Sequence, residues 1–205
     1  MPGSLPLSLS LPRPAELLVR LTIAAMLVIW PARVFEHDIV ARLLPLLQTA
    51  IPLLDSDIDV LDLTVGRIGS SDSARLRANL AHPVALSGGM LRPFAGWVEI
   101  NLTLGGAVAY SVFELIVVLA WPAMTNRELA VRVLIAIPLA LLLLIHVPLT
   151  LIAEIWNAIY QNFAADESSA LLRLSRFIMG GGGFAVAATF AAIAIVMASE
   201  RSNAR

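Results

Sequence analysis

The stretch Val133–Ala153 reads VLIAIPLALLLLIHVPLTLIA, and His146 is its only ionisable residue. A helix needs about 20 apolar residues to cross the hydrocarbon core of a bilayer. Leu102–Trp121 and Ile178–Ala198 are similarly long and apolar, and Leu17–Phe35 is a fourth such stretch with arginines near its ends. The sequence therefore predicts an all-α membrane protein: a four-span transmembrane helical bundle with a small extracytoplasmic α+β segment.

Composition supports this class. Of the 205 residues, 59% are hydrophobic and only 14% are charged, too few polar groups to cover a soluble globule. The 14 basic residues are all arginines and the net charge is −1, so no basic stripe is available to bind nucleic acid. The chain has no cysteine, which excludes thiolate catalysis, iron–sulfur clusters and cysteine-bound zinc.

The predicted spans divide the chain into five parts. We expect a cytoplasmic tail over 1–16, the first transmembrane helix over 17–35, an extracytoplasmic segment over 36–101, a three-helix transmembrane region over 102–198 and a cytoplasmic tail over 199–205. The first helix lacks a small-x-small cleavage site after it, so it is expected to remain as an anchor. Arginines near the spans favour the two ends and the loop after Trp121, which predicts that both termini are cytoplasmic. The membrane expected is a bacterial-type inner (plasma) membrane.

The segment between the first two spans is too long for a simple connection. Asp38–Leu54 is apolar but is interrupted by Pro45 and Pro52, which predicts a kinked helix at the membrane surface. Ile58–Ile68 resembles a strand followed by a turn, and Ala74–Leu86 a second extended stretch. A small sheet is therefore expected outside the membrane.

Carboxylates alternate at the start of this sheet, at Asp55, Asp57, Asp59 and Asp62. Alternate carboxylates can surround a calcium ion, but an EF-hand counted from Asp55 would need Gly where Val60 stands and Glu where Gly66 stands. We expect a solvated strand edge and no metal site.

Four polar residues are expected inside the bundle as one cluster: Arg20, Tyr110, Glu114 and His146. A carboxyl group within a span is protonated, paired or turned towards a polar cavity. Arg20 can extend along the first helix, which predicts a Glu114–Arg20 ion pair that either locks two helices together or serves a proton relay. Tyr110 and His146 lie at similar depths, which predicts a hydrogen bond between them.

His146 also permits a second interpretation. A histidine inside a bundle can ligate haem or a chlorophyll-type pigment. His37 and His82 fall outside the predicted spans, so this chain alone offers no bis-histidine site. A structural hydrogen bond with no bound cofactor is the main expectation, and haem or pigment is the alternative.

Small residues predict close contact between helices. Those expected to pack against neighbouring helices are Gly105, Gly106, Gly180, Gly181, Gly182 and Gly183. Four consecutive glycines also weaken a helix, so a break is expected at the start of the last span. Pro138 and Pro148 are expected to kink the third span.

No catalytic pattern accompanies these features: the chain has no nucleophile elbow, no His-x-x-x-His pair and no phosphate-binding loop. The expected function is a non-catalytic polytopic accessory or scaffold subunit of an inner-membrane complex, with other membrane subunits and the lipid bilayer as partners. Two alternatives are a haem- or pigment-binding subunit using His146 and a small oligomeric transporter using Glu114.

One family resemblance adds to this expectation. A first span, an apolar proline-containing segment and a β-like stretch precede Trp97-Val98-Glu99-Ile100-Asn101-Leu102, which leads into paired spans. This order, over about Leu17–Trp156, resembles the small membrane proteins associated with exosortase H. The chain departs from that family where Leu102 and Thr103, not Pro and Leu, follow Asn101, and in having a fourth span. The resemblance implies a role accessory to an envelope protein-sorting peptidase.

Overall fold

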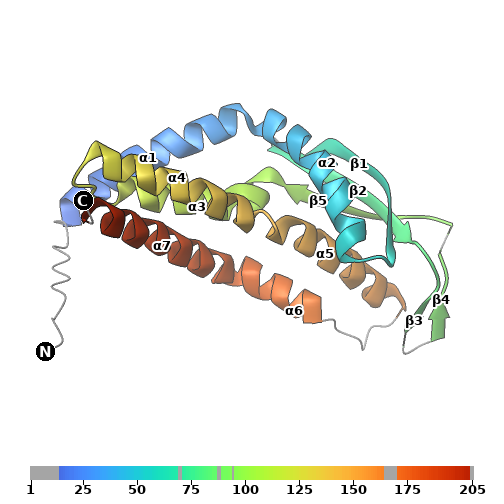
Figure 1. Ribbon diagram of the computed structural model, residues 1–205. Coiled ribbons are helices and arrows are strands. Elements are labelled where there is room, and N and C mark those ends of the chain that lie inside the picture. Colours follow the sequence, from blue (N-terminus) through green and yellow to red (C-terminus); the bar gives the residue numbers. More distant parts are fainter. Residues whose placement is uncertain (1–13, 69–70, 87–88, 94, 164–169, 204–205) are drawn as a thin grey trace, which may run out of the picture.

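The computed structural model describes residues 14–68, 71–86, 89–93, 95–163 and 170–203. These residues are mostly helical, with a small sheet region. The molecule is elongated, with a bundle of long helices at one end and the sheet with its covering helices at the other (Figure 1). The predicted tail over 1–16 lies almost entirely outside the described residues.

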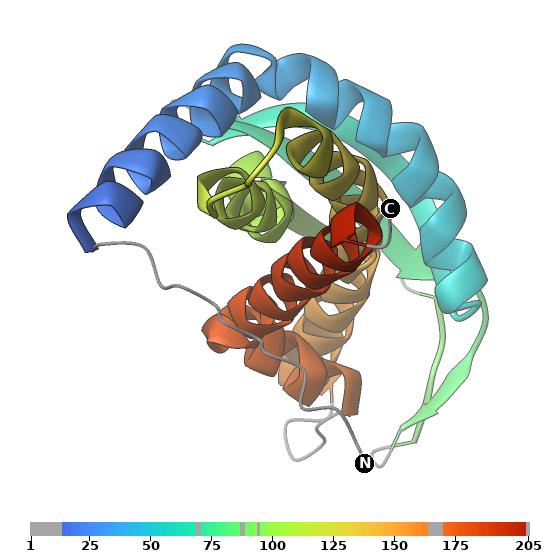
Figure 2. The same cartoon turned by 60° about the vertical axis from the view of Figure 1, so that its left-hand side comes forward.

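Four helices form the bundle, and they are α1 (Pro14–Val34), α3 (Leu104–Ala120), α4 (Asn126–Leu143) and α7 (Gly183–Asn203). Helices α3, α4 and α7 contact one another, and α1 lies against α3 on the outside (Figure 2). Buried alanines on α7 recur every three or four residues, so one narrow face of small side chains allows the other helices to approach closely.

Three helical segments are long and apolar enough to cross a membrane: Pro14–Val34, Asn126–Phe163 and Ala170–Arg201. A shorter apolar helix covers Ala107–Ala120. The chain therefore has the helices of a multi-pass membrane protein. The second predicted span begins two residues later than expected, because the chain is still in a strand up to Thr103.

The sheet contains β1 (Ile58–Ile68), β2 (Ser71–Leu80) and β5 (Val98–Thr103), antiparallel with β2 in the centre. Strands β3 (Val84–Leu86) and β4 (Gly89–Leu91) form a separate hairpin. The strand predicted over Ile58–Ile68 is confirmed. The second extended stretch is divided between β2 and β3, and β5 was not predicted.

The two faces of the sheet differ in polarity. Leu76 pairs with Leu63 on one side and with Ile100 on the other, so these side chains share a face. Along β2, Ala74, Leu76, Ala78 and Leu80 are buried, while the residues between them are only partly buried. Such alternation is expected of an antiparallel sheet with one solvated face.

Helices α2 (Glu36–Leu54) and α5 (His146–Phe163) contribute to the core on the apolar face. This core joins residues of α2, of the sheet and of α5, among them Leu47, Ile51, Leu76, Leu151 and Ile155. The Trp156 indole also donates a hydrogen bond of 2.6 Å to Asp55 Oδ2, which ties α5 to the end of α2. The helix predicted over Asp38–Leu54 is thus present, with both prolines inside it.

The third predicted span lies within Asn126–Phe163, a segment long and apolar enough to cross a membrane, but the chain breaks after Leu143 into α4 and α5, close to the kink expected at Pro148. Pro148 has no N–H to donate to the Leu144 carbonyl, and Val147 N donates to that carbonyl instead at 3.0 Å. The apolar residues after the break are buried in the core that α2, α5 and the sheet form together, at the end of the molecule that we call the sheet half. Their hydrophobicity therefore reflects packing within the protein.

The last predicted span also contains a break. Helix α6 (Ala170–Phe177) is followed by a π-helical turn, η1 (Ile178–Gly182), before α7 begins. Gly181 has φ 115°, a conformation that other residues rarely adopt. The break expected from the glycine run is confirmed, and residues 102–198 contain α3 to α7 in place of three uninterrupted spans.

Candidate functional site

Glu114 is the most unusual polar residue of the bundle. Its side chain is 0% exposed, and neither carboxyl oxygen has a hydrogen-bond partner among the described residues. It lies one helical turn after Tyr110 and one turn before Val118, so all three share a face of α3. A carboxyl group without a partner in such a place is costly in its charged form.

Apolar clusters lie on both sides of Glu114 along the bundle. Tyr110 belongs to a cluster with Leu143 of α4 and Ala187 of α7. Val118 belongs to a second cluster, which contains Ala136 of α4 together with Ala191 and Ala194 of α7. Glu114 thus occupies the level between two apolar layers, where the neighbouring helices contribute mainly small side chains.

The predicted Glu114–Arg20 ion pair is wrong. Arg20 pairs with Glu16 one turn earlier on its own helix, at 2.7 Å between Arg20 Nη2 and Glu16 Oε1. Both side chains of this pair are about half exposed, at 41% and 51%. The local partner four residues away leaves the guanidinium near solvent, and it does not reach the middle of the bundle.

Tyr110 and His146 do meet, but not through the predicted hydrogen bond. Their rings form an edge-to-face contact with centroids 4.8 Å apart and planes at 64°. The Tyr110 hydroxyl donates instead to the carbonyl of Ile178, at 2.9 Å. His146 Nδ1 contacts the carbonyl of Leu143 at the end of α4. The pair therefore joins α3, the α4–α5 junction and the turn η1 that precedes the last helix.

The predicted packing glycines have different environments. A Cβ atom built on Gly183 would lie 2.4 Å from Tyr110 Cζ, so the close approach of α7 to α3 requires glycine there. A Cβ on Gly182 would meet the Phe177 ring at 2.4 Å. Gly105 and Gly180 have no such neighbour within 4 Å, and the surroundings of Gly106 lie outside the described residues.

A buried ion pair at the start of α4 was not predicted. Arg132 and Glu128 are 3% and 5% exposed and are joined by a hydrogen bond and salt bridge. Arg132 also donates to the Trp121 carbonyl at 3.0 Å, and Glu128 accepts from Met124 N at 2.9 Å. Two sequence signals were available: the Thr125-x-x-Glu128 capping pattern and the four-residue spacing of Glu128 and Arg132.

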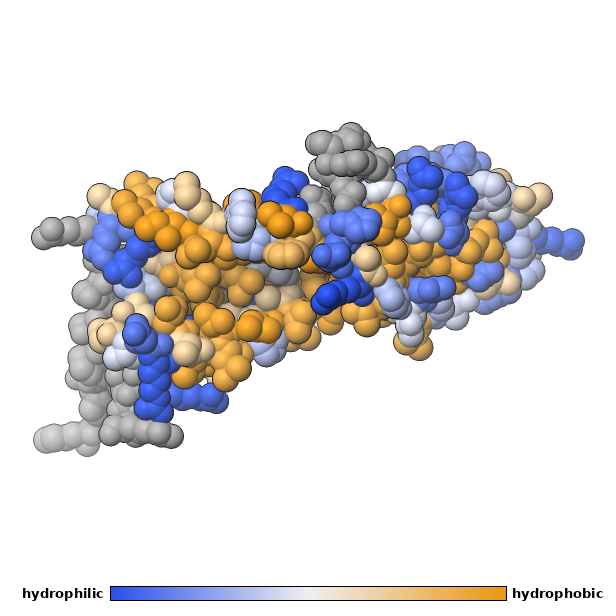
Figure 3. Space-filling model, turned by 90° about the horizontal axis from the view of Figure 1, so that it is seen from above, coloured by the Kyte–Doolittle hydropathy of each residue, from blue (hydrophilic) through white to orange (hydrophobic). Residues whose placement is uncertain are grey.

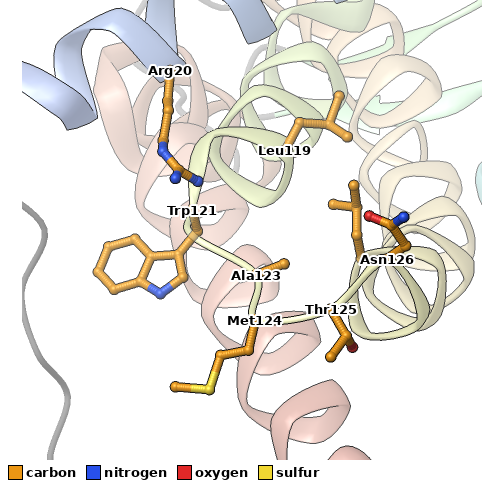
Figure 4. A pocket seen from close by; sticks show the side chains of 8 residues that line it. Arg20, Leu119, Trp121, Ala123, Met124, Thr125 and Asn126 are labelled. Carbon is orange, nitrogen blue, oxygen red and sulfur yellow. The ribbon is translucent and has the colours of Figure 1, made fainter.

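A cavity of about 400 Å³ opens at the same end of the bundle (Figure 4). Arg20 extends from α1 towards the loop between α3 and α4, and this loop forms much of the wall. The lining combines one charged group with polar and apolar ones, from Arg20, Leu119, Trp121, Ala123, Met124, Thr125, Asn126 and Leu129. Because Glu16 already neutralises Arg20, the cavity carries no clear charge preference.

The polar face of the sheet is organised around Glu99 on β5. Arg77 Nε and Arg75 Nε lie 3.0 and 3.3 Å from its two carboxyl oxygens. The Arg77 guanidinium also lies 5.1 Å from the centre of the Trp97 ring, as a cation–π contact. The hydrogen bond from Arg77 holds the pKa of Glu99 below its usual value. These groups are therefore held in fixed positions on an accessible surface.

The two acidic residues just before β1, Asp55 and Asp57, bind other parts of the protein. Asp55 accepts the Trp156 hydrogen bond, and Asp57 Oδ1 lies 2.6 Å from His82 Nε2. In the described part of the chain, no three His, Cys, Asp or Glu side chains gather where they could hold a metal ion.

In comparisons with known proteins, no family model, no curated protein and no solved structure matches the chain.

Proposed function

We propose that the protein is a non-catalytic accessory or scaffold subunit of a membrane complex, with the bundle in the bilayer and the sheet half outside it. In this arrangement α1, α3, α4 and α7 are four spans. Helix α3 has 17 residues and is about 26 Å long at about 1.5 Å per residue, close to the about 30 Å of a hydrocarbon core.

The surface of the bundle supports its placement in lipid. Hydrophobic side chains gather over this half of the face seen in Figure 3, and hydrophilic ones over much of the other half. Helix α1 exposes large apolar residues along most of its length, including Leu18, Met26, Leu27 and Trp30 at 64–70%. In water such a surface would be unfavourable, whereas lipid chains would cover it without cost.

The polar face of the sheet is the observation that best supports a scaffold role. Glu99, Arg75 and Arg77 form a charged network on a face that the core helices do not use, and Trp97 adds a rigid aromatic surface. Arginine and tryptophan are enriched in the contacts that dominate protein interfaces. We infer that this face binds a partner subunit outside the membrane.

The connection between the two halves suits a scaffold. Only two residues, Leu144 and Ile145, separate α5 from α4, and the buried face of α5 forms part of the core beneath the sheet. The Tyr110–His146 contact fixes the same junction from α3. A partner bound at the sheet would therefore be held in a defined position relative to the membrane.

The side of the membrane follows from the arginine distribution, which favours a cytoplasmic location for the termini and the α3–α4 loop. The sheet half is then extracytoplasmic, in a bacterial-type inner membrane. The resemblance to exosortase H-associated proteins makes an envelope protein-sorting peptidase the first partner to look for.

The test is purification of the tagged protein at native expression in a mild detergent, followed by mass spectrometry of the chains that co-purify. We expect stoichiometric partner chains with the wild type and with Arg173→Glu, a charge reversal at an exposed site on α6. Arg77→Glu breaks the network with Glu99 and is expected to release the partner while the protein still folds.

Two outcomes would contradict the proposal. One is a particle that contains only this chain in the wild type. The other is a partner retained equally by Arg77→Glu and the control, which would remove the sheet from the interface. A visible absorption spectrum of the same sample tests the haem or pigment alternative, whose band would be lost in His146→Ala.

A further inference from the structure

We infer that Glu114 is a proton-binding site of the bundle: it is held as the neutral acid in the structure described here and exchanges one proton with water. The inference goes beyond a scaffold role. It depends on the proposed membrane placement of α3 in one respect: lipid around the bundle makes the surroundings of Glu114 still less polar.

The first step is the isolation of the carboxyl group. Glu114 is fully buried, and both oxygens lack a hydrogen-bond partner within the described residues. A buried carboxylate without a partner would lose its hydration and gain nothing in return, whereas the neutral acid has a far smaller desolvation cost. Because nothing compensates the buried charge, Glu114 favours the protonated, neutral carboxylic acid.

The second step is the absence of a counter-charge at the level of Glu114, among the described parts of the packed helices. Helix α7 has no ionisable side chain from Gly183 to Ser199, and α1 has none from Leu21 to Ala32. On α3 the nearest ionisable group is the Tyr110 hydroxyl, which is bonded to Ile178, and His146 contacts the Tyr110 ring.

Two cations on the helices packed around α3, Arg20 of α1 and Arg132 of α4, are already paired, whereas Arg127 of α4 and the adjacent Glu200 and Arg201 of α7 lie at the far ends of their helices. Arg20 is bound to Glu16. On α4, Arg132 is bound to Glu128 and to the Trp121 carbonyl. Trp121 lies seven residues beyond Glu114, about 10 Å along α3 at about 1.5 Å per residue. Arg132 is thus held near the end of α3 and is not available to Glu114.

The third step concerns what proton release requires. Release transfers the proton to water and leaves a carboxylate that must be solvated or paired. The neighbouring layer contains Ala136, Ala191 and Ala194, which are fully buried and apolar, so water reaches a carboxylate at Glu114 only if α3, α4 and α7 move apart. Protonation of Glu114 therefore keeps these helices packed, and deprotonation loosens them.

The experiment is infrared spectroscopy of the purified full-length protein in detergent. A protonated carboxyl group has a C=O stretching band distinct from that of a carboxylate, and the band shifts in heavy water. We expect this band near neutral pH in the wild type and its loss in Glu114→Gln, which keeps the size of the side chain. Glu128→Gln is the matched control, because Glu128 is paired with Arg132 and should contribute no such band.

A pH titration of the same samples completes the test. As the pH is raised, the wild-type band should disappear reversibly, and amide hydrogen exchange in α3 should increase by more than the intrinsic, base-catalysed rise of exchange with pH. Glu114→Gln should show only that intrinsic rise in exchange.

A band equally strong in Glu114→Gln would overturn the inference, as would a wild-type band that does not change with pH. The infrared band reports on the proton site alone and co-purification of partner chains reports on the scaffold role, so failure of one is distinguishable from failure of the other.

Discussion

Gly183 tests the packing of α7 against α3 at the level of a single atom. In Gly183→Ala the new methyl group would fall 2.4 Å from the Tyr110 ring, so one helix must move. We expect a loss of about 1–3 kcal/mol in the free energy of unfolding, the usual cost of overpacking. Thermal unfolding in a mild detergent measures it.

Gly105→Ala is the control for this substitution. A Cβ on Gly105 has no neighbour within 4 Å, and alanine favours a helix more than glycine does. The control should unfold at the same temperature or higher. Equal destabilisation of both variants would mean that Gly183 is not at a close helix contact.

The contribution of Glu99 to the stability of the folded protein is expected to depend on pH. The hydrogen bond from Arg77 lowers its pKa in the folded protein, so its contribution is present above the unfolded value of about 4.3 and is lost as the pH falls through the lower folded value. Wild type and Glu99→Gln should therefore differ most near neutral pH and converge on acidification. Unfolding temperatures measured across that range check this, and a constant difference would refute it.

Residue-level sequence reasoning found the unusual positions but not all of their partners. Glu114, Tyr110 and His146 stand out because polar groups are rare in apolar runs, and the Tyr110–His146 proximity followed from their similar depths. The Glu114–Arg20 pair failed because depth along two helices does not fix the rotation of either one. The competing partner, Glu16, was visible four residues away from Arg20.

At the scale of the elements, the hydrogen bond from Trp156 to Asp55 joins α5 to the end of α2. We therefore expect the effects of substituting the two residues on the free energy of unfolding to be coupled. Each of Trp156→Phe and Asp55→Ala should destabilise the protein, because each removes one end of a partly buried hydrogen bond. The double variant should lose about 1–2 kcal/mol less than the sum of the two single losses. Additive losses in chemical unfolding would show that the bond contributes nothing to stability.

The helices and first strand were predictable because periodicity and turn residues are local signals. The division of Val133–Ala153 between α4 and α5 was not, since an apolar helix under a sheet has the same composition as one in lipid. Pro148 marked a kink but not its consequence. Strand β5 was hidden because its residues ran into the apolar stretch of α3 without a turn.

For the whole molecule, the arrangement in two halves explains why a long segment separates the first two bundle helices. That segment forms α2 and the sheet, and α5 returns later in the chain to complete the same core. The sheet half therefore depends on residues from both sides of α3. Separate expression of residues 36–101 should give a chain without cooperative unfolding, whereas a folded fragment would show that α5 is dispensable.

The placement of the bundle across a membrane can be tested directly, because the chain has no cysteine of its own. Single cysteines at Thr64, in β1, and at Met124, in the α3–α4 loop, are both at exposed sites. In intact bacterial cells a membrane-impermeant maleimide should label Thr64→Cys, and it should label Met124→Cys only after the membrane is permeabilised. Labelling of both sites from the same side would contradict the claim, because α3 would then not cross the membrane.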